Sequence, residues 1–304
     1  MLTGEIRNQV DKIWDSFWSG GISNPIEVIE QITYLLFLRR LDELHTLEEQ
    51  KARELKRPME RRIFPEGLDR EADKGGRPYE ELRWSHLKQL ANAEELFTLF
   101  EGHVFPFLRK LGAEGSAYGR HMKDARFTIP TPALLAKVVD LVAKLPLGQR
   151  DTKGDLYEYM LGKIASAGQN GQFRTPRHVI RLMVEMVAPT PTDVICDPAL
   201  GTAGFLVEAG EFLRERYPRL LIDPKSKDHF HAGMFHGFDF DSTMLRIGSM
   251  NLLLHGVENP DVRYRDSLAS SADGDAERYT LVLANPPFAG SLDTETIAAD
   301  LTRV

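Results

Sequence analysis

Four residues near the end of the chain, Asn285-Pro286-Pro287-Phe288, have the chemistry needed to hold a planar amine. The Asn285 side-chain oxygen and the Pro286 carbonyl could accept hydrogen bonds from the two N–H groups of an aromatic amine. This would free the nitrogen lone pair for attack on a methyl group. The prolines fix φ, so the turn is rigid before a substrate arrives. Phe288 could stack on a flipped base, which is worth about 1–3 kcal/mol per base. We therefore expect a catalytic turn that requires neither a metal ion nor an enzyme nucleophile.

A turn with two glycines, at residues 197–204, lies between an expected strand and an expected helix. Glycine lets the backbone pass close to a ligand, and the unpaired N–H groups of the following helix favour an anion. The G-x-G-x-x-G spacing of dinucleotide sites is absent, which favours a smaller ligand with one carboxylate. A plain strand–turn–helix corner is the alternative. The candidate cofactor-binding residues in this turn are Asp197, Gly201, Thr202, Ala203 and Gly204.

Acidic residues also end the next two expected strands. A carboxylate at Asp239 could accept both hydroxyls of a ribose, each charge-assisted bond being worth about 1.5–3 kcal/mol. Asp266 could accept the exocyclic amine of an adenine in the cofactor. A single aspartate at such a position is more often a helix cap or a turn residue, but several at successive strand ends favour a ligand site.

The segment 171–177 (Gly-Gln-Phe-Arg-Thr-Pro-Arg) precedes the first helix of the same region. It could fold over a bound cofactor. Local chemistry also offers a simpler interpretation, because a threonine followed by proline is typical of a helix N-terminus, and on local chemistry alone we expect Thr175 to be a cap. The candidate cofactor-binding residues here are Gln172, Phe173, Arg174, Thr175, Pro176 and Arg177.

Strands and helices are expected to alternate through the second half of the chain. The expected strands are 193–198, 234–240, 262–266 and 279–284, and the expected helices begin after Thr175-Pro176 and span 204–217 and 242–254. This alternation predicts a parallel sheet with its ligand at the carboxyl edge of the strands. We therefore predict an α/β protein whose second domain, residues 166–304, is Rossmann-like.

The first half has a helical pattern instead. Asn24-Pro25 is typical of a helix start, and apolar residues follow it at helical spacing. A loop rich in turn formers is expected at 65–80, followed by a helical region at 82–107. Thr131-Pro132 begins a further expected helix that runs to Leu145. Because a small, polar run follows at 166–171, we predict an all-helical N-terminal domain at residues 1–165.

The composition is typical of a folded protein without a membrane span, with 42% apolar and 27% charged residues. The chain shows no apolar run of about 18–20 residues and no secretory signal, so no membrane contact and a cytoplasmic location are expected. With one cysteine, no internal disulfide can form. Cys196 lies inside an expected strand, so a buried core residue is favoured over a nucleophile.

The net charge of −7 bears on nucleic-acid binding. A protein that grips DNA alone usually has a basic face, because neutralising phosphates supplies most of the non-specific affinity. An acidic chain therefore predicts a partner that shares the DNA contacts. The basic stretch 51–62 could form a local DNA-binding patch, although a solvated helix face is favoured for any single cluster.

The order of the 171–177 loop, the glycine turn, the acidic strand end and the N-P-P-F turn resembles the amino-methyltransferases of the gamma arrangement. More closely, it resembles the modification subunit of type I restriction–modification systems. Ile13-Trp14 and the run 34–42 (Tyr-Leu-Leu-Phe-Leu-Arg-Arg-Leu-Asp) are similar to the N-terminal domain of that family. The likeness spans nearly the whole chain.

This resemblance implies methyl transfer from S-adenosyl-L-methionine to N6 of a flipped adenine in DNA. It implies that residues 172–177, 201–203 and Asp239 contact the cofactor and that residues 285–288 hold the base. It also implies that the helical domain contacts DNA or partner subunits. The expected partners are DNA, a specificity subunit that reads the sequence, a second modification subunit and a restriction subunit.

The chain also departs from the family pattern. The family often has an aromatic residue at Arg174, Cys or Ala at Leu200, Gly at Ala203 and Glu at Asp239. Four of the family's seven strands are expected here, which predicts an incomplete sheet and a C-terminally truncated methyltransferase domain. The alternatives are a non-catalytic assembly or DNA-binding module, and methyl transfer to an RNA base or a protein glutamine.

Overall fold

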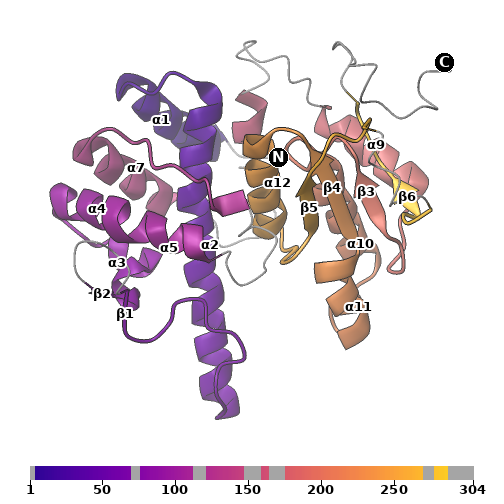
Figure 1. Cartoon of the computed structure of the whole chain (residues 1–304), viewed down its shortest axis with the longest axis horizontal. Coiled ribbons are helices and arrows are strands. Elements are labelled where there is room, and N and C mark those ends of the chain that lie inside the picture. Colours follow the sequence, from indigo (N-terminus) through magenta and orange to yellow (C-terminus); the bar gives the residue numbers. More distant parts are fainter. Residues whose placement is uncertain are drawn as a thin grey trace. The chain divides into compact units, whose positions relative to one another are not determined.

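The computed structural model describes residues 4–69, 76–111, 121–146, 159–163, 175–269 and 277–286. The chain divides into two compact units, Met1–Glu114 with Met122–Ile164, and Gly115–His121 with Ala165–Val304, and each is described by itself (Figure 1). In the part of the chain that the structure describes, no helix is both long enough and apolar enough to span a membrane.

The first unit is built on the long helix α2 (Pro25–Leu55). Its predicted start is confirmed, because the Asn24 side chain accepts a hydrogen bond from the backbone N–H of Ile26 at 3.0 Å and Pro25 is the first helical residue. The other elements of this unit are α1 (Gly4–Ser19), β1 (Leu68–Asp69), β2 (Arg77–Pro78), η1 (Tyr79–Leu82), α3 (Trp84–Leu87), α4 (Ala93–Leu99), η2 (Phe100–Val104), α5 (Phe105–Lys110) and α7 (Pro132–Lys144).

Three features of this unit bear on the sequence-based predictions. The turn-rich loop 65–80 contains the antiparallel pair β1–β2. The helical region 82–107 is divided, since Asn92 caps a new helix by accepting hydrogen bonds from the N–H groups of Glu94 and Glu95. The start of α7 is confirmed, because the Thr131 hydroxyl accepts a hydrogen bond from the N–H of Leu134 at 3.3 Å.

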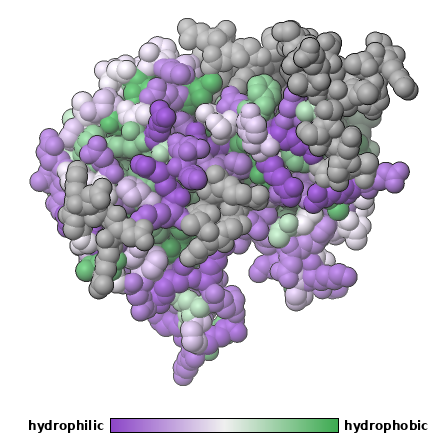
Figure 2. Space-filling view, in the orientation of Figure 1, coloured by the Kyte–Doolittle hydropathy of each residue, from purple (hydrophilic) through white to green (hydrophobic). Residues whose placement is uncertain are grey.

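The basic stretch 51–62 lies at the end of α2 and in the loop that follows. Three of its cations form ion pairs with nearby acidic side chains: Lys51 and Arg57 with Glu60, at 2.9 and 2.7 Å, and Arg62 with Glu66 at 2.8 Å. Figure 2 shows mainly hydrophilic side chains on the projecting end of this unit. Paired charges of this kind favour the solvated-face interpretation over a basic DNA-binding patch.

The second unit contains a four-stranded sheet with the order β5-β4-β3-β6. The strands are β3 (Ile195–Asp197), β4 (Phe235–Asp239), β5 (Asp261–Tyr264) and β6 (Leu281–Val282). All three pairings are parallel, with Cys196 opposite both His236 and Val282. The predicted parallel α/β sheet is therefore confirmed. Cys196 has 2% of its surface exposed, which confirms that it is a core residue.

Helices α9 (Arg177–Val187), α10 (Gly204–Arg216) and α12 (Ser242–Leu254) accompany this sheet, together with α11 (Pro224–Asp228) and η3 (His229–Gly233). Helix α10 packs against both α9 and α12 (Figure 1). Buried side chains such as Leu206, Phe235 and Leu245 form a common core. Helix α12 is capped by Asp241, whose carboxylate accepts the N–H of Thr243 at 2.8 Å. Ser242 is the first helical residue.

Candidate functional site

The strand order creates a switch point at β3. Strands β3, β4 and β5 follow one another across the sheet, and the chain then returns to the other side of β3 as β6. The loops that leave the two strands at such a point diverge, and ligands of open α/β sheets bind in the crevice between them. Here these are the loop after β3, which contains the glycine turn, and the loop after β6, which contains Asn285 and Pro286.

The glycine turn adopts left-handed backbone conformations and is held by α12. Gly201 has φ +50° and Ala203 has φ +65°, a region that costs a residue with a Cβ about 1–2 kcal/mol. The Asn251 side chain donates a hydrogen bond to the carbonyl oxygen of Thr202 at 2.8 Å. A Cβ at Gly248 would lie 3.0 Å from the carbonyl oxygen of Gly201, so α12 approaches this closely because it has glycine there.

Glycines also compensate for the unusual residue Leu200, which is buried with 3% of its surface exposed. A Cβ at Gly237 would lie 2.5 Å from Leu200 Cδ1, and a Cβ at Gly248 would lie 3.3 Å from Leu200 Cδ2. Both glycines leave space for a side chain larger than the Cys or Ala of the family pattern. The departure at this position is therefore absorbed by packing within the unit.

Asp239, at the end of β4, fixes the turn from the neighbouring strand. Its Oδ2 accepts a hydrogen bond from the backbone N–H of Gly201 at 2.8 Å, and its Oδ1 accepts one from Asp241 at 2.9 Å. Burial raises the pKa of Asp239 above its ordinary value, against the effect of these backbone hydrogen bonds. Since a carboxylate can accept about four hydrogen bonds, the two hydroxyls of a ribose fit the acceptor capacity of this side chain.

Asp197 lies beneath the turn, with 1% of its surface exposed. Its Oδ1 accepts a hydrogen bond from the N–H of Ala199 at 3.0 Å. Burial, together with the negative charge of Asp239, raises the pKa of Asp197 to about 7. The side chain therefore shapes the turn, and its contact with a cofactor stays a prediction.

Asp266 lies two residues beyond β5 and is exposed. Its Oδ1 accepts a hydrogen bond from the N–H of Leu268 at 2.9 Å, which is ordinary behaviour for an aspartate in a turn. The next residue, Ser267, donates a hydrogen bond to the carbonyl oxygen of Pro198 at 2.6 Å. That bond holds the loop after β5 against the loop after β3. It does not involve Asp266, whose contact with a cofactor stays a prediction.

Asn285 is linked to the segment before α9. Its Nδ2 donates a hydrogen bond to Thr175 Oγ1 at 2.9 Å, across 110 residues of sequence. Thr175 is not the cap of α9, because the cap position is Pro176, which makes no side-chain cap bond within the described part of the chain. The prediction of a Thr175 cap is wrong, since local sequence cannot reveal a partner so distant.

The side chain of Arg177 is engaged by α10. Its guanidinium donates to Glu208 at 3.3 Å and to Glu211 at 2.8 Å. Burial raises the pKa of Glu208, against the effect of this nearby cation. Pro176 is exposed, and the remaining predicted site residues of the two loops lie outside the described residues: Gln172, Phe173, Arg174, Pro287 and Phe288.

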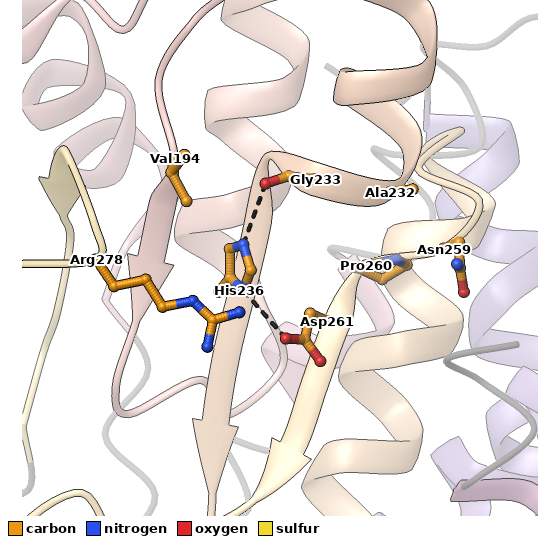
Figure 3. Close-up of a pocket in the computed structure, with 8 residues that line it drawn as sticks. All are labelled: Val194, Ala232, Gly233, His236, Asn259, Pro260, Asp261 and Arg278. Atoms are coloured by element: carbon orange, nitrogen blue, oxygen red, sulfur yellow. Dashed lines mark hydrogen bonds and ion pairs between the residues drawn. The ribbon is translucent and has the colours of Figure 1, made fainter. Parts of the chain in front are cut away.

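The opposite edge of the sheet has a cavity of about 420 Å³ (Figure 3). His236 lies at its centre, with Nδ1 3.2 Å from Asp261 Oδ2 and Nε2 3.1 Å from the carbonyl oxygen of Gly233. Arg263 also pairs with Asp261 at 2.6 Å. Burial would raise the pKa of Asp261, but its hydrogen bonds with His236 and Arg263 outweigh burial and lower it. This cavity lies where strands begin, away from the glycine turn and Asn285.

Several residues of the site were not singled out from the sequence. Gly237, Gly248 and Asn251 shape or hold the turn, yet each lies within a regular strand or helix and has no motif around it. Their signal is the small or polar residue at an otherwise apolar, buried position. That signal becomes specific only when the neighbouring loop is known.

Comparison with known proteins places both halves of the chain. The model of the N-6 DNA Methylase family matches residues 148–303, and that of the HsdM N-terminal domain matches residues 6–142. The EcoEI methylase subunit of a type I restriction enzyme from Escherichia coli is 26% identical over 281 residues, covering 89% of this chain and 53% of that protein. The chain spans about half the length of the curated relatives it matches.

Solved structures agree on the fold. A chain from a type I R-M system is similar with a TM-score of 0.68 and 26% identity, covering 95% of this chain and 56% of that one. The type I restriction-modification system methyltransferase subunit from Streptococcus thermophilus has a TM-score of 0.62 at 18% identity, covering 94% of this chain and 64% of that one. At this identity the second likeness shows the fold alone.

Proposed function

The chain belongs to the N-6 DNA methylase family, and on this premise we propose that it methylates N6 of adenine in DNA as the modification subunit of a type I restriction–modification system. The observation that carries the proposal is the position of Asn285. It follows β6, which pairs with β3, and the N–H of Leu283 bonds to the carbonyl oxygen of Cys196 at 2.9 Å. Asn285, the proposed hydrogen-bond acceptor for a planar amine, therefore lies at the same edge of the sheet as the glycine turn, on the other side of the switch point.

The residues at this edge fit S-adenosyl-L-methionine. The N-cap of α10, Ala203, provides no side-chain cap bond in the described part of the chain, so the first N–H groups of α10 can bind a carboxylate. A Cβ at Gly201 would have no atom within 4 Å, so a ligand can approach the backbone closely. Asp239 supplies acceptors for the ribose hydroxyls. When bound, the cofactor supplies a methyl group already activated on its sulfonium.

The role of the loop after β6 is to hold and activate the target amine. The Asn285 side-chain oxygen and the Pro286 carbonyl accept hydrogen bonds from its two N–H groups. This takes the nitrogen lone pair out of conjugation with the purine ring. Phe288 stacks on the flipped base. Most of the rate enhancement then comes from holding amine and methyl group in line and from excluding water.

We propose that DNA, a specificity subunit, a second modification subunit and a restriction subunit are the partners. The net charge of −7 supports shared DNA contacts, as do the ion pairs of Lys51, Arg57 and Arg62 with acidic side chains. The matched relatives are themselves named as methylase subunits of restriction enzymes.

A methyl-transfer assay tests this function. The chain is combined with the specificity subunit of its own system, duplex DNA and isotope-labelled cofactor, and the digested nucleosides are separated by mass spectrometry. The expected product is labelled N6-methyladenine. Label found only in RNA or in protein glutamine would replace the proposal with one of those activities. Failure to bind the cofactor in titration calorimetry would favour a non-catalytic module.

A further inference from the structure

Thr175 has a hydrogen-bond partner that its local sequence does not predict, the side-chain amide of Asn285. Resting on the proposed function, we propose that Thr175 is a positioning residue for methyl transfer. Its hydroxyl binds the amide nitrogen of Asn285 and so keeps the amide oxygen turned toward the target amine. Thr175 then acts through Asn285 and not through the cofactor.

The chemistry of the amide makes such a device necessary. The oxygen and nitrogen of an asparagine side chain have nearly the same shape, but the oxygen accepts hydrogen bonds and the nitrogen donates them. An amide rotated by half a turn would set its N–H groups against the N–H groups of the substrate amine. In the structure Nδ2 lies 2.9 Å from Thr175 Oγ1, so the bond restricts rotation of the side chain and the amide oxygen lies on the side away from Thr175.

Sequence and packing both fix the position of the hydroxyl. Threonine is β-branched and has few χ1 rotamers, and a residue before proline is confined to extended backbone. The helix that follows is anchored to α10 by the ion pair of Arg177 with Glu211 and by Ile180, whose Cδ1 lies 3.1 Å from where a Cβ at Gly204 would be. Because α10 begins directly after the glycine turn, these contacts connect the proposed cofactor turn to the amide of Asn285.

Two substitutions separate this role from the alternatives. Thr175→Val removes the hydroxyl and keeps the branched shape, so we expect kcat for adenine methylation to fall about 10- to 100-fold, the range for a slightly misplaced reacting group. The affinity for S-adenosyl-L-methionine should stay within about threefold, because the hydroxyl serves Asn285. Thr175→Ser restores the hydroxyl and should keep at least about a third of the wild-type kcat.

Thr280→Val is the matched control. It removes a threonine hydroxyl that bonds to Asp193 Oδ1 at 2.7 Å, at the start of the same strand β6. It should lower the melting temperature at least as much as Thr175→Val but leave kcat within about twofold. An equal loss of kcat in Thr280→Val would overturn the proposal, since the effect would then be structural. Loss of cofactor affinity in Thr175→Val with unchanged kcat would overturn it in favour of a cofactor contact.

A second measurement does not depend on catalysis. In ¹⁵N-labelled full-length chain, the Asn285 side-chain amide signals are assigned by their disappearance in Asn285→Asp. The proposal expects slowed hydrogen exchange of these signals in the wild type and in Thr175→Ser, and fast exchange in Thr175→Val. Unchanged exchange in Thr175→Val contradicts it. If the wild type makes no methyladenine, the proposed function fails, while the exchange data still decide the hydrogen bond.

Discussion

The aspartates at the two edges of the parallel sheet differ in their hydrogen-bond partners and in the direction of their pKa shifts. At the carboxyl edge, Asp197 and Asp239 accept hydrogen bonds from backbone N–H groups, and burial raises the pKa of both, to about 7 for Asp197. At the amino edge, Asp261 is paired with His236 (Figure 3). It is also paired with Arg263, and its pKa is lowered despite burial. The pKa of an aspartate is thus shifted in opposite directions at the two ends of neighbouring strands.

This difference separates a binding edge from a structural edge. A carboxylate matched by cations has its charge satisfied within the fold, and its removal should cost stability alone. A buried carboxylate with a raised pKa is costly to the fold, which is a common property of functional sites. A cavity lies at the amino edge, yet the switch point and the left-handed turn lie at the carboxyl edge. These differences support our proposal that the carboxyl edge is the functional edge.

The largest effect is expected for Asn285→Ala. Removing one of the two acceptors for the target amine should slow methyl transfer about 10²- to 10³-fold, as does loss of one group that stabilises a transition state elsewhere. Single-turnover transfer of labelled methyl groups to DNA measures this rate. The matched change at the other edge, Asn259→Ala in the wall of the amino-edge cavity, should leave the rate within about twofold. Equal losses would erase the distinction between the edges.

Asp197→Asn should stabilise the protein, and only at high pH. The folded wild type keeps this proton up to about pH 7, whereas an unfolded aspartate loses it near its ordinary pKa of 3.8. The unfolding free energy of the wild type therefore falls as pH rises through this window, and asparagine avoids the loss. We expect a gain of about 2–4 kcal/mol at pH 8 and little change at pH 4, from urea unfolding. A gain independent of pH would contradict the burial of a titrating carboxyl.

Asp239→Asn should weaken binding of S-adenosyl-L-methionine about tenfold, or about 1.4 kcal/mol, because the bonds to the ribose lose their charge assistance. The variant retains one oxygen, which can accept from the N–H of Gly201, but it loses the bond from the N–H of Asp241 because its NH2 group cannot accept one. Titration calorimetry gives the affinity. Unchanged affinity would remove Asp239 from the cofactor site.

Asp261→Asn should have a purely structural effect. A lowered pKa in the folded state adds stability above the unfolded pKa, and this stability is lost as pH falls through the folded pKa. We expect a loss of about 1–2 kcal/mol at pH 7 that shrinks below pH 4, with unchanged cofactor affinity. Weaker cofactor binding would instead implicate the amino edge.

The regular elements were predictable because their signals are local. Asn24 and Thr131 start helices by bonding to residues two or three positions ahead, and apolar strands alternate with helices throughout the second unit. The residue types at the strand ends also predicted that Asp239 and Asn285 lie at the carboxyl edge of the sheet, which the structure confirms.

The contacts that hold the site were not predictable, because their partners are distant in sequence. Thr175 has the local signature of a cap but binds Asn285. The space for Leu200 depends on Gly237 and on Gly248, which lie on different elements. In the first unit, Arg83 likewise reaches back to Asp42 at 2.6 Å, across 41 residues. Such pairings become visible only when packing brings the elements together.

The most direct test of the functional edge is to map S-adenosyl-L-methionine onto backbone amide signals of the ¹⁵N-labelled chain. The largest shifts on titration are predicted for the glycine turn, residues 199–204, and for the loop after β4, residues 239–241. Signals of the amino-edge cavity, such as Gly233, His236 and Asn259, should stay in place. Shifts confined to that cavity, or none in either region at saturating cofactor, would contradict the assignment of function to the carboxyl edge.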